Sequence, residues 1–358
     1  MSYKSKMDKW EATALERTLK IHNSHPFIKQ EDKTQIITPK HKKKDIYRTR
    51  QTHVQETAVI ASMIATRLGF KYKKQLFNIC ISHDLGHSPY GHEGGKILDV
   101  KMRKAGLREG FSDNNANFDV IFNNQMEYSD YELASIVKKP QNLYGYQKKY
   151  LQEMIDRANA FEAAQWGTNK VQTMGSLIMD FADPLSYAFS DFVDGYALGY
   201  TKFTACEFVK SLKKEAKDKK IKKLLKKVEA SIVQKSSTRA FRHLFSSLKI
   251  KFIESVFYDK ENGEIGMNKN NMQLLEKVIS FNYLMFIKHP RVEADKFEVI
   301  DGFEQYIDYI LKNTYFTSNY YREQYLLETS KKKKLRVLRN MIGDSTDSYV
   351  QHFVEENL

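Results

Sequence analysis

The sequence is poor in three residue types that mark specialised scaffolds: its 358 residues include only 2 cysteines, 6 prolines and 2 tryptophans. Cys80 and Cys206 are too few for a disulfide framework, and both stand in apolar, helix-like contexts that suit a reducing compartment. No uninterrupted apolar run reaches the length of a membrane span, and no apolar segment follows the first basic residues. We therefore expect a soluble, cytoplasmic protein with no membrane partner.

Acidic residues are fewer than basic ones: the chain has 44 Asp and Glu and 58 Lys and Arg, which gives a formal net charge of +14. This surplus predicts a polyanionic partner, a nucleoside triphosphate or a nucleic acid, with a lysine-rich background composition as the alternative. Lysines are densest over residues 209–235, where the pattern predicts a basic amphipathic helix or helix pair. A solvated face is the simpler interpretation of that segment, and binding of single-stranded DNA or another nucleic acid is the alternative.

Helical periodicity runs through most of the chain. Apolar residues recur at three- and four-residue steps from Thr52 until Gly69, a natural C-cap. Residues 171–200 predict one long helix, and the pattern stays helical after Arg239. The predicted C-terminal helices cover residues 241–257, 272–288, 303–313 and 334–355, with a turn at 258–263. A short β-hairpin is expected near residues 34–48, and no tandem repeat is found.

A His-Asp pair, His83-Asp84, follows an apolar segment, and imidazole and carboxylate both suit divalent first-row ions. Taken alone, such a pair is more often an ordinary surface or capping pair. His53, at the start of an apolar helix, and Asp183, inside the 171–200 helix, would complete four ligands with positions left open for water or substrate. We therefore predict a metal site from three distant stretches of sequence.

The 171–200 helix carries a polar stripe. At about 100° per residue one face collects Asp180, Asp183, Tyr187, Asp191 and Asp194. A solvated acidic face is the usual explanation of such a pattern. The rest of this helix is rich in Phe, Leu, Ile, Met and Ala, which predicts burial, and buried carboxylates must be paired or bind a cation.

Four blocks, in the same order, resemble the deoxynucleoside triphosphate triphosphohydrolases, the dGTPase-like enzymes of the HD-domain superfamily. They are the segment 27–36 with Lys33-Thr-Gln-Ile, the block Arg48-Thr-Arg50-Gln-Thr-His53, the run from His83 to His92, and Ala182-Asp183-Pro-Leu-Ser-Tyr187 with Asp191. The resemblance implies an all-α HD-domain helical bundle with additional C-terminal helices. Residues 1–205 would form the metal-dependent core, and residues 206–358 would pack on it in one continuous domain.

The resemblance also implies roles for individual residues. One divalent metal ion, Mn²⁺ or Mg²⁺ with Fe, Co, Ni or Zn as alternatives, would be held by His53, His83, Asp84 and Asp183. Phosphate would be bound by Arg50 and Arg48. The α-phosphate would be lined by His87 and His92, with His92 transferring the proton. The sugar and base would meet Tyr187, Asp191, Glu31 and Gln35.

The implied reaction is hydrolysis of a deoxynucleoside triphosphate to deoxynucleoside and inorganic triphosphate, and we expect a homo-oligomer. Two alternatives stay open: a nucleotide phosphomonoesterase or signalling-nucleotide hydrolase of another HD branch, and a nucleotide-sensing or nucleic-acid-binding relative. The chain departs from the family pattern in two places. Glu31 stands where the family commonly has a base-contacting Gln, and the stretch 114–117 lacks the family's Gln at its end. The other departure follows the run from His83 to His92. The family has an acidic residue three positions after the last histidine of the run, whereas this chain has Gly95, and Glu93 would point elsewhere on a helix.

Overall fold

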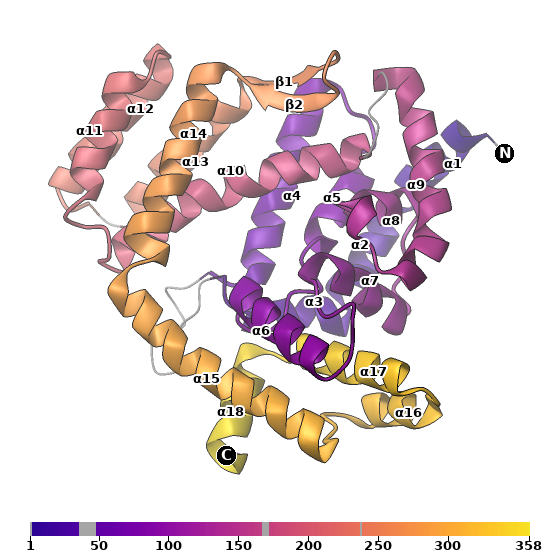
Figure 1. Ribbon diagram of the computed structural model, residues 1–358. Coiled ribbons are helices and arrows are strands. Elements are labelled where there is room, and N and C mark those ends of the chain that lie inside the picture. The colour runs from indigo at the N-terminus through magenta and orange to yellow at the C-terminus, as the bar shows by residue number, and fades with distance from the viewer. Residues whose placement is uncertain (1, 36–47, 167–171, 237) are drawn as a thin grey trace.

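The computed structural model describes residues 2–35, 48–166, 172–236 and 238–358, and most of them are α-helical (Figure 1). The first ten helices are α1 (Tyr3–Ala12), α2 (Ala14–His22), α3 (His25–Lys29), α4 (Arg50–Leu68), α5 (Lys73–Ser82), α6 (Gly91–Lys104), α7 (Asp113–Asn123), α8 (Asp130–Ile136), α9 (Gly145–Trp166) and α10 (Met174–Ala197). The remaining helices are α11 (Ala205–Glu215), α12 (Lys219–Val233), α13 (Thr238–Ile253), α14 (Lys269–Asn282), α15 (Pro290–Asn313), α16 (Asn319–Leu327), α17 (Lys331–Asp344) and α18 (Asp347–Asn357). Two short 3-10 helices, η1 (Gln30–Asp32) and η3 (Pro140–Asn142), and a π-helical turn, η4 (Tyr283–Ile287), connect some of these helices. The predicted all-α class is confirmed.

One antiparallel hairpin interrupts the helices, formed by β1 (Val256–Asp259) and β2 (Glu264–Met267). It corrects the prediction that helix continues to residue 257 and that a turn starts at 258. The Asp259 carboxylate accepts hydrogen bonds from Asn262 and from the backbone N–H of Glu261, which tightens the connection. The hairpin expected near residues 34–48 lies mostly outside the described residues, which show an isolated antiparallel bridge between Thr34 and Thr49.

Helix α4 is the central element, and it packs most extensively against α5 and α10 (Figure 1). It begins after Thr49, whose side chain accepts a hydrogen bond from the Thr52 N–H, and it ends at Gly69 with φ of 74°. A row of fully buried small residues lets the neighbouring helices approach: Ala58, Ala61 and Ala65. Helices α5 and α10 therefore pack closely on α4 and also on each other.

The buried apolar side chains form two clusters. The larger one joins α1–α5 with α7–α14, and the smaller one joins α6 with α15, α17 and α18. Helix α6 thus packs against the C-terminal helices α15 and α17 (Figure 1). Apolar contacts cross the expected division at residue 205 in both clusters, and that division stays a prediction.

The basic segment 209–235 forms the helix pair α11 and α12, which pack on each other through Val209, Leu212, Ile221, Leu225 and Val228. Across the described ranges, no helix is both long and apolar enough to cross a bilayer.

Candidate active site

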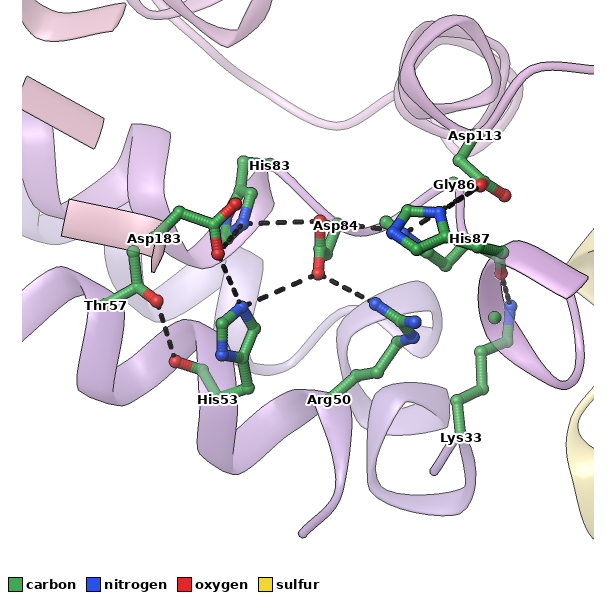
Figure 2. Close-up of polar contacts among 12 residues, drawn as sticks. Lys33, Arg50, His53, Thr57, His83, Asp84, Gly86, His87, Asp113 and Asp183 are labelled. Atoms are coloured by element: carbon green, nitrogen blue, oxygen red, sulfur yellow. Dashed lines mark hydrogen bonds and ion pairs between the residues drawn. The ribbon is translucent and has the colours of Figure 1, made fainter. Parts of the chain in front are cut away.

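Two histidines and one aspartate predicted as metal ligands converge from three helices (Figure 2). His53 lies in the first turn of α4, His83 ends α5, and Asp183 lies in the middle of α10. Nε2 of His53 is 3.0 Å from Oδ1 of Asp183, and Nε2 of His83 is 3.8 Å from the same oxygen. One ligand atom from each residue falls within 4.8 Å of the others, so the chain brings these three predicted residues together.

His83 is fixed in one orientation by its own helix. Its Nδ1 donates a hydrogen bond to the carbonyl oxygen of Cys80 at 2.6 Å, so in the neutral ring the lone pair is on Nε2, which is turned toward Asp84 and Asp183. Nε2 is buried and has no hydrogen-bond partner among the described residues. Burial disfavours the charged imidazole, but the two carboxylates outweigh burial and raise the pKa of His83.

Asp84, the fourth predicted ligand, lies at the centre of the cluster in Figure 2. Its Oδ1 is 3.3 Å from Nε2 of His83 and 3.3 Å from Nδ1 of His87, while its Oδ2 accepts a hydrogen bond from Nη1 of Arg50 at 2.9 Å. Burial opposes ionisation, yet the surrounding imidazoles and the guanidinium hold the pKa of Asp84 well below its usual range. The carboxylate is therefore an anion in the folded protein.

Lys138 is a neighbour of the cluster that no sequence pattern singled out. It stands between α8 and η3, and its Nζ lies 3.2 Å from Oδ2 of Asp183. This contact leaves Oδ1 of Asp183 facing His53. Burial opposes the charge of Asp183, but Lys138 and the two histidines hold its pKa well below the ordinary value.

The donor set fits a divalent first-row cation. Ligand atoms about 2.0–2.2 Å from one ion lie roughly 3–4 Å apart. The separations of 3.0, 3.3, 3.8 and 3.9 Å between imidazole nitrogens and carboxylate oxygens agree with that spacing. The unpartnered Nε2 of His83 is a further sign that an electron-pair acceptor belongs there. These residues could hold one metal ion.

The two arginines predicted to bind phosphate have different surroundings. Arg50 is buried against Asp84, and its Nη2 packs so tightly on Gly91 that a Cβ there would lie 2.5 Å away. Arg48 instead pairs with Glu56, and its Nε lies 3.5 Å from Asp194. Arg50 thus adjoins the His-Asp cluster directly, whereas Arg48 belongs to a neighbouring ionic network.

The two histidines expected at the α-phosphate lie side by side, with ring centroids 4.9 Å apart. His87 is buried, and neither of its ring nitrogens has a hydrogen-bond partner in the described part of the chain. Burial first, and then the charge of Arg50, lower the pKa of His87 to about 3, so its imidazole is neutral. The side chain of His92 is 74% exposed, and its Nδ1 lies 3.0 Å from Oδ2 of Asp113, an acid that the sequence did not suggest.

The residues predicted to meet sugar and base are spread over two segments. Tyr187 and Asp191 follow Asp183 at one-turn intervals on α10. Burial, and then the charge of Asp194, raise the pKa of Asp191 to about 7, and its Oδ1 lacks a hydrogen-bond partner within the described residues. Glu31 is exposed in η1, and Gln35 is partly buried at the end of the described range 2–35. Their relation to a nucleotide stays a prediction.

Backbone contacts hold the His83–His92 turn in place. The Asn117 side chain on α7 donates to the His83 carbonyl and accepts from the Gly86 N–H, each at 2.6 Å. Tyr90 has a φ of 60°, unusual for a non-glycine residue, and its N–H donates to Asp347 of α18. Asp347 also accepts hydrogen bonds from Thr34, so the last helix ties two parts of the site together.

A cavity of about 450 Å³ lies elsewhere, between α3, α16, α17 and α18. Its lining includes His25, Lys29, Tyr321 and Asp344, and Lys29 and Asp344 are paired at 2.6 Å. It shares no residue with the His-Asp cluster.

Comparison with known proteins finds dGTPase-like relatives. No family model matches the chain. It is 29% identical over 232 residues to a deoxyguanosinetriphosphate triphosphohydrolase-like protein of Wolinella succinogenes, and 23% identical over 354 residues to one of Leptospira interrogans. The chain is thus similar to dGTPase-like proteins over much of its length. The first match covers 63% of this chain and 58% of the relative, less than two thirds of the relative's length, and the second covers 93% and 86%.

A further dGTPase-like relative, from Caulobacter vibrioides, is 36% identical over 118 residues, which cover 33% of this chain and 28% of the relative. Among solved structures, a hypothetical protein from Aquifex aeolicus matches with a TM-score of 0.47 at 14% identity and covers 95% of this chain and 68% of that chain.

Proposed function

We propose that this dGTPase-like protein is a metal-dependent hydrolase that converts deoxynucleoside triphosphates to deoxynucleoside and inorganic triphosphate. The observation that carries the proposal is the convergence of His53, His83 and Asp183 within 4.8 Å, next to Asp84. The name of the relatives, deoxyguanosinetriphosphate triphosphohydrolase-like protein, supports the same class of substrate.

The metal would be held by Nε2 of His53, Nε2 of His83 and one oxygen each of Asp84 and Asp183. A divalent ion bound there would withdraw charge from a phosphoryl group and make water easier to ionise at neutral pH. Neighbouring groups orient two of these ligands. Cys80 fixes the tautomer of His83, and Lys138 leaves one oxygen of Asp183 directed at the histidines.

Positive charge beside the cluster suits a polyphosphate. Arg50 and Lys138 each hold one carboxylate of the cluster and keep further N–H donors. Nε of Arg50 has no partner among the described residues, and a guanidinium binds phosphate oxygens through several donors at once. We assign Arg50 to phosphate binding, with Lys138 adding charge next to it.

His92 would move the proton. The proposed reaction forms a bond from water oxygen to the α-phosphorus and breaks the bond from that phosphorus to the 5′-oxygen. The departing 5′-oxygen needs a proton, and the attacking water loses one. The exposed imidazole of His92 can reach an incoming substrate, whereas the neutral, buried His87 offers polar contacts without taking a charge.

Asp191 would recognise the 3′-hydroxyl of the sugar, with Tyr187 packing beside the ring. Its support is the position of both residues on the same helix as Asp183 and the unpartnered Oδ1 of Asp191. A buried acceptor without a donor is satisfied when a hydroxyl group binds to it.

The test is to incubate the purified protein with Mn²⁺ or Mg²⁺ and each deoxynucleoside triphosphate in turn, and to separate the products by ion exchange. We expect tripolyphosphate and deoxynucleoside in equal amounts, and no product when a chelator is present. Orthophosphate or pyrophosphate as the product would instead indicate a reaction of another HD branch.

Two variants and a control assign the ligands. His83→Ala and Asp183→Ala should lose metal binding, measured by calorimetry, together with turnover. His352→Ala is the matched control, because this exposed histidine pairs with Glu356 one turn away on α18. Activity that survives both ligand substitutions would contradict the assignment.

A further inference from the structure

The space next to Gly95 is already filled by a carboxylate from another helix. Gly95 follows His92 by three residues on α6. A Cβ atom added to Gly95 would lie 3.0 Å from Oδ1 and 3.2 Å from Oδ2 of Asp113, closer than side-chain carbons normally approach an oxygen. Any side chain at position 95 would therefore start against the Asp113 carboxylate.

Asp113, the first residue of α7, reaches the histidine pair from the opposite side. Its Oδ2 accepts a hydrogen bond from Nδ1 of His92 at 3.0 Å and lies 3.9 Å from Nε2 of His87. Its Oδ1 accepts a hydrogen bond from the Ser88 N–H at 3.4 Å. The Asp113 side chain is only 13% exposed, so these contacts hold it in one place.

We propose that Asp113 is the positioning residue for His92 and supplies, from α7, the carboxylate that dGTPase-like proteins carry at the position of Gly95. This inference rests on the proposed function, because it gives His92 its orientation for proton transfer. The space between α6 and α7 holds a single carboxylate, and in this chain that carboxylate belongs to Asp113 of α7.

The contact with Asp113 determines which nitrogen of His92 is available for proton transfer. Because a carboxylate can only accept, Nδ1 carries the proton and Nε2 is left free to take one. A nearby negative charge then stabilises the imidazolium that forms, as in other acid–histidine pairs. The exposed His92 ring needs such a partner, since solvent alone would leave it in many rotamers.

Glu93, the acidic residue nearest to His92 in sequence, does not position the His92 ring. Its Oε1 lies 3.0 Å from Nζ of Lys96 and 3.3 Å from Nζ of Lys296. It thus joins a surface ion pair that links α6 to α15, and Glu93→Gln serves as a matched control in the experiment below.

The experiment compares the wild type with Asp113→Ala, the double variant Asp113→Ala/Gly95→Glu, and Glu93→Gln. Two readouts are measured: kcat and KM for the best deoxynucleoside triphosphate, and the ¹⁵N resonances of the Mg²⁺-loaded, ¹⁵N-histidine-labelled protein. The His92 signals are assigned by their absence in His92→Gln. Circular dichroism melting shows whether each variant is folded.

We expect Asp113→Ala to lower kcat about 10- to 100-fold while KM changes little, the usual effect of removing a partner that orients a working imidazole. The ¹⁵N spectrum should lose the pattern of protonated Nδ1 and free Nε2. The double variant should recover both, because the removed carboxylate leaves room for the new one. Glu93→Gln should keep both readouts at the wild-type value.

An Asp113→Ala protein with unchanged kcat and an unchanged His92 tautomer would overturn the inference. So would a second Mg²⁺ bound by His87, His92 and Asp113, whose ligand atoms also lie within 4.8 Å of one another, because Nδ1 would then hold metal instead of a proton. If the wild type consumes no deoxynucleoside triphosphate, the proposed function fails, and the tautomer readout alone decides the role of Asp113.

Discussion

Nη1 of Arg50 donates a hydrogen bond to Oδ2 of Asp84 across 2.9 Å, and both side chains are almost completely buried. The pair joins the first turn of α4 to the end of α5. Gly91 makes room for the far side of the guanidinium, and Nε has no partner among the described residues. One part of Arg50 therefore steadies a predicted metal ligand while its other donors remain for an anion.

Arg50→Lys should lower kcat/KM for a deoxynucleoside triphosphate about 10- to 100-fold, because a single ammonium cannot hold Asp84 and several phosphate oxygens at once. Steady-state kinetics measures the loss, and calorimetry should show a smaller loss of metal affinity, because an ammonium can still contact Asp84. Arg157→Lys is the control, since Arg157 makes an exposed pair with Glu153. An unchanged kcat/KM in Arg50→Lys would remove Arg50 from phosphate binding.

The ligand cluster could be predicted from sequence because its residues stand in short patterned blocks. His53 follows a helix start, the His83-Asp84 pair stands where an apolar segment meets a turn, and Asp183 sits on the polar stripe of a long apolar helix. Each pattern is local, and the resemblance to dGTPase-like enzymes assigned the residues to one metal site. The structure adds the long-range packing of α4, α5 and α10 that brings them together.

Asp113 and Lys138 could not be predicted in this way. Each is a single charged residue in a segment without strong periodicity, and its importance comes from which helix packs beside it. The hairpin at β1 and β2 was missed for a related reason. A short run of aromatic and β-branched residues at a helix end fits either helix or strand, and only the tight turn at Asp259 decides between them.

Metal binding should raise thermal stability. The two imidazoles are only 1–2% exposed, so a cation that they hold binds the folded chain and not the unfolded one. A Mn²⁺ concentration a hundredfold above its Kd should stabilise the fold by about 2.7 kcal/mol. Scanning calorimetry should show a higher Tm that a chelator reverses and that Asp183→Ala abolishes. A Tm that does not change when Mn²⁺ or Mg²⁺ is added would contradict a metal site formed by His53, His83 and Asp183.

Asp191→Asn should stabilise the protein at pH 8 and weaken substrate binding. Burial, and then Asp194, raise the pKa of Asp191 to about 7, so the folded state holds a proton that the unfolded state has released. The stability this proton contributes is complete below the ordinary aspartate pKa and is lost as pH rises through about 7. Removing the charge should therefore add on the order of 2 kcal/mol at pH 8.

The same substitution tests the sugar contact. KM for a deoxynucleoside triphosphate should fall in the wild type as pH rises through 7, because the ionised carboxylate is the stronger acceptor, and Asp191→Asn should remove this trend. A 2′,3′-dideoxy substrate lacks the hydroxyl and should bind both proteins alike. Asp180→Asn, on the exposed face of α10, is the control for both measurements. Equal losses with the two substrates would exclude a contact to the 3′-hydroxyl.

Gly86→Ala should unfold the site although it changes no polar group. A Cβ at position 86 would lie 2.2 Å from the backbone N of Asn117 and 2.4 Å from the backbone C of Ala116, so α7 would have to move as a whole. That movement would break the hydrogen bonds by which Asn117 holds the His83–His92 turn.

We expect Gly86→Ala to lower the free energy of unfolding by at least roughly 3 kcal/mol, measured by urea denaturation, and to abolish metal binding at temperatures where the chain stays folded. Gly145→Ala is the matched control, since nothing lies within 4 Å of a Cβ there. It should be neutral or stabilise the protein by up to about 1 kcal/mol. Equal stabilities for the two variants would mean that α7 does not rest on Gly86, and the positions of both Asn117 and Asp113 would then need another cause.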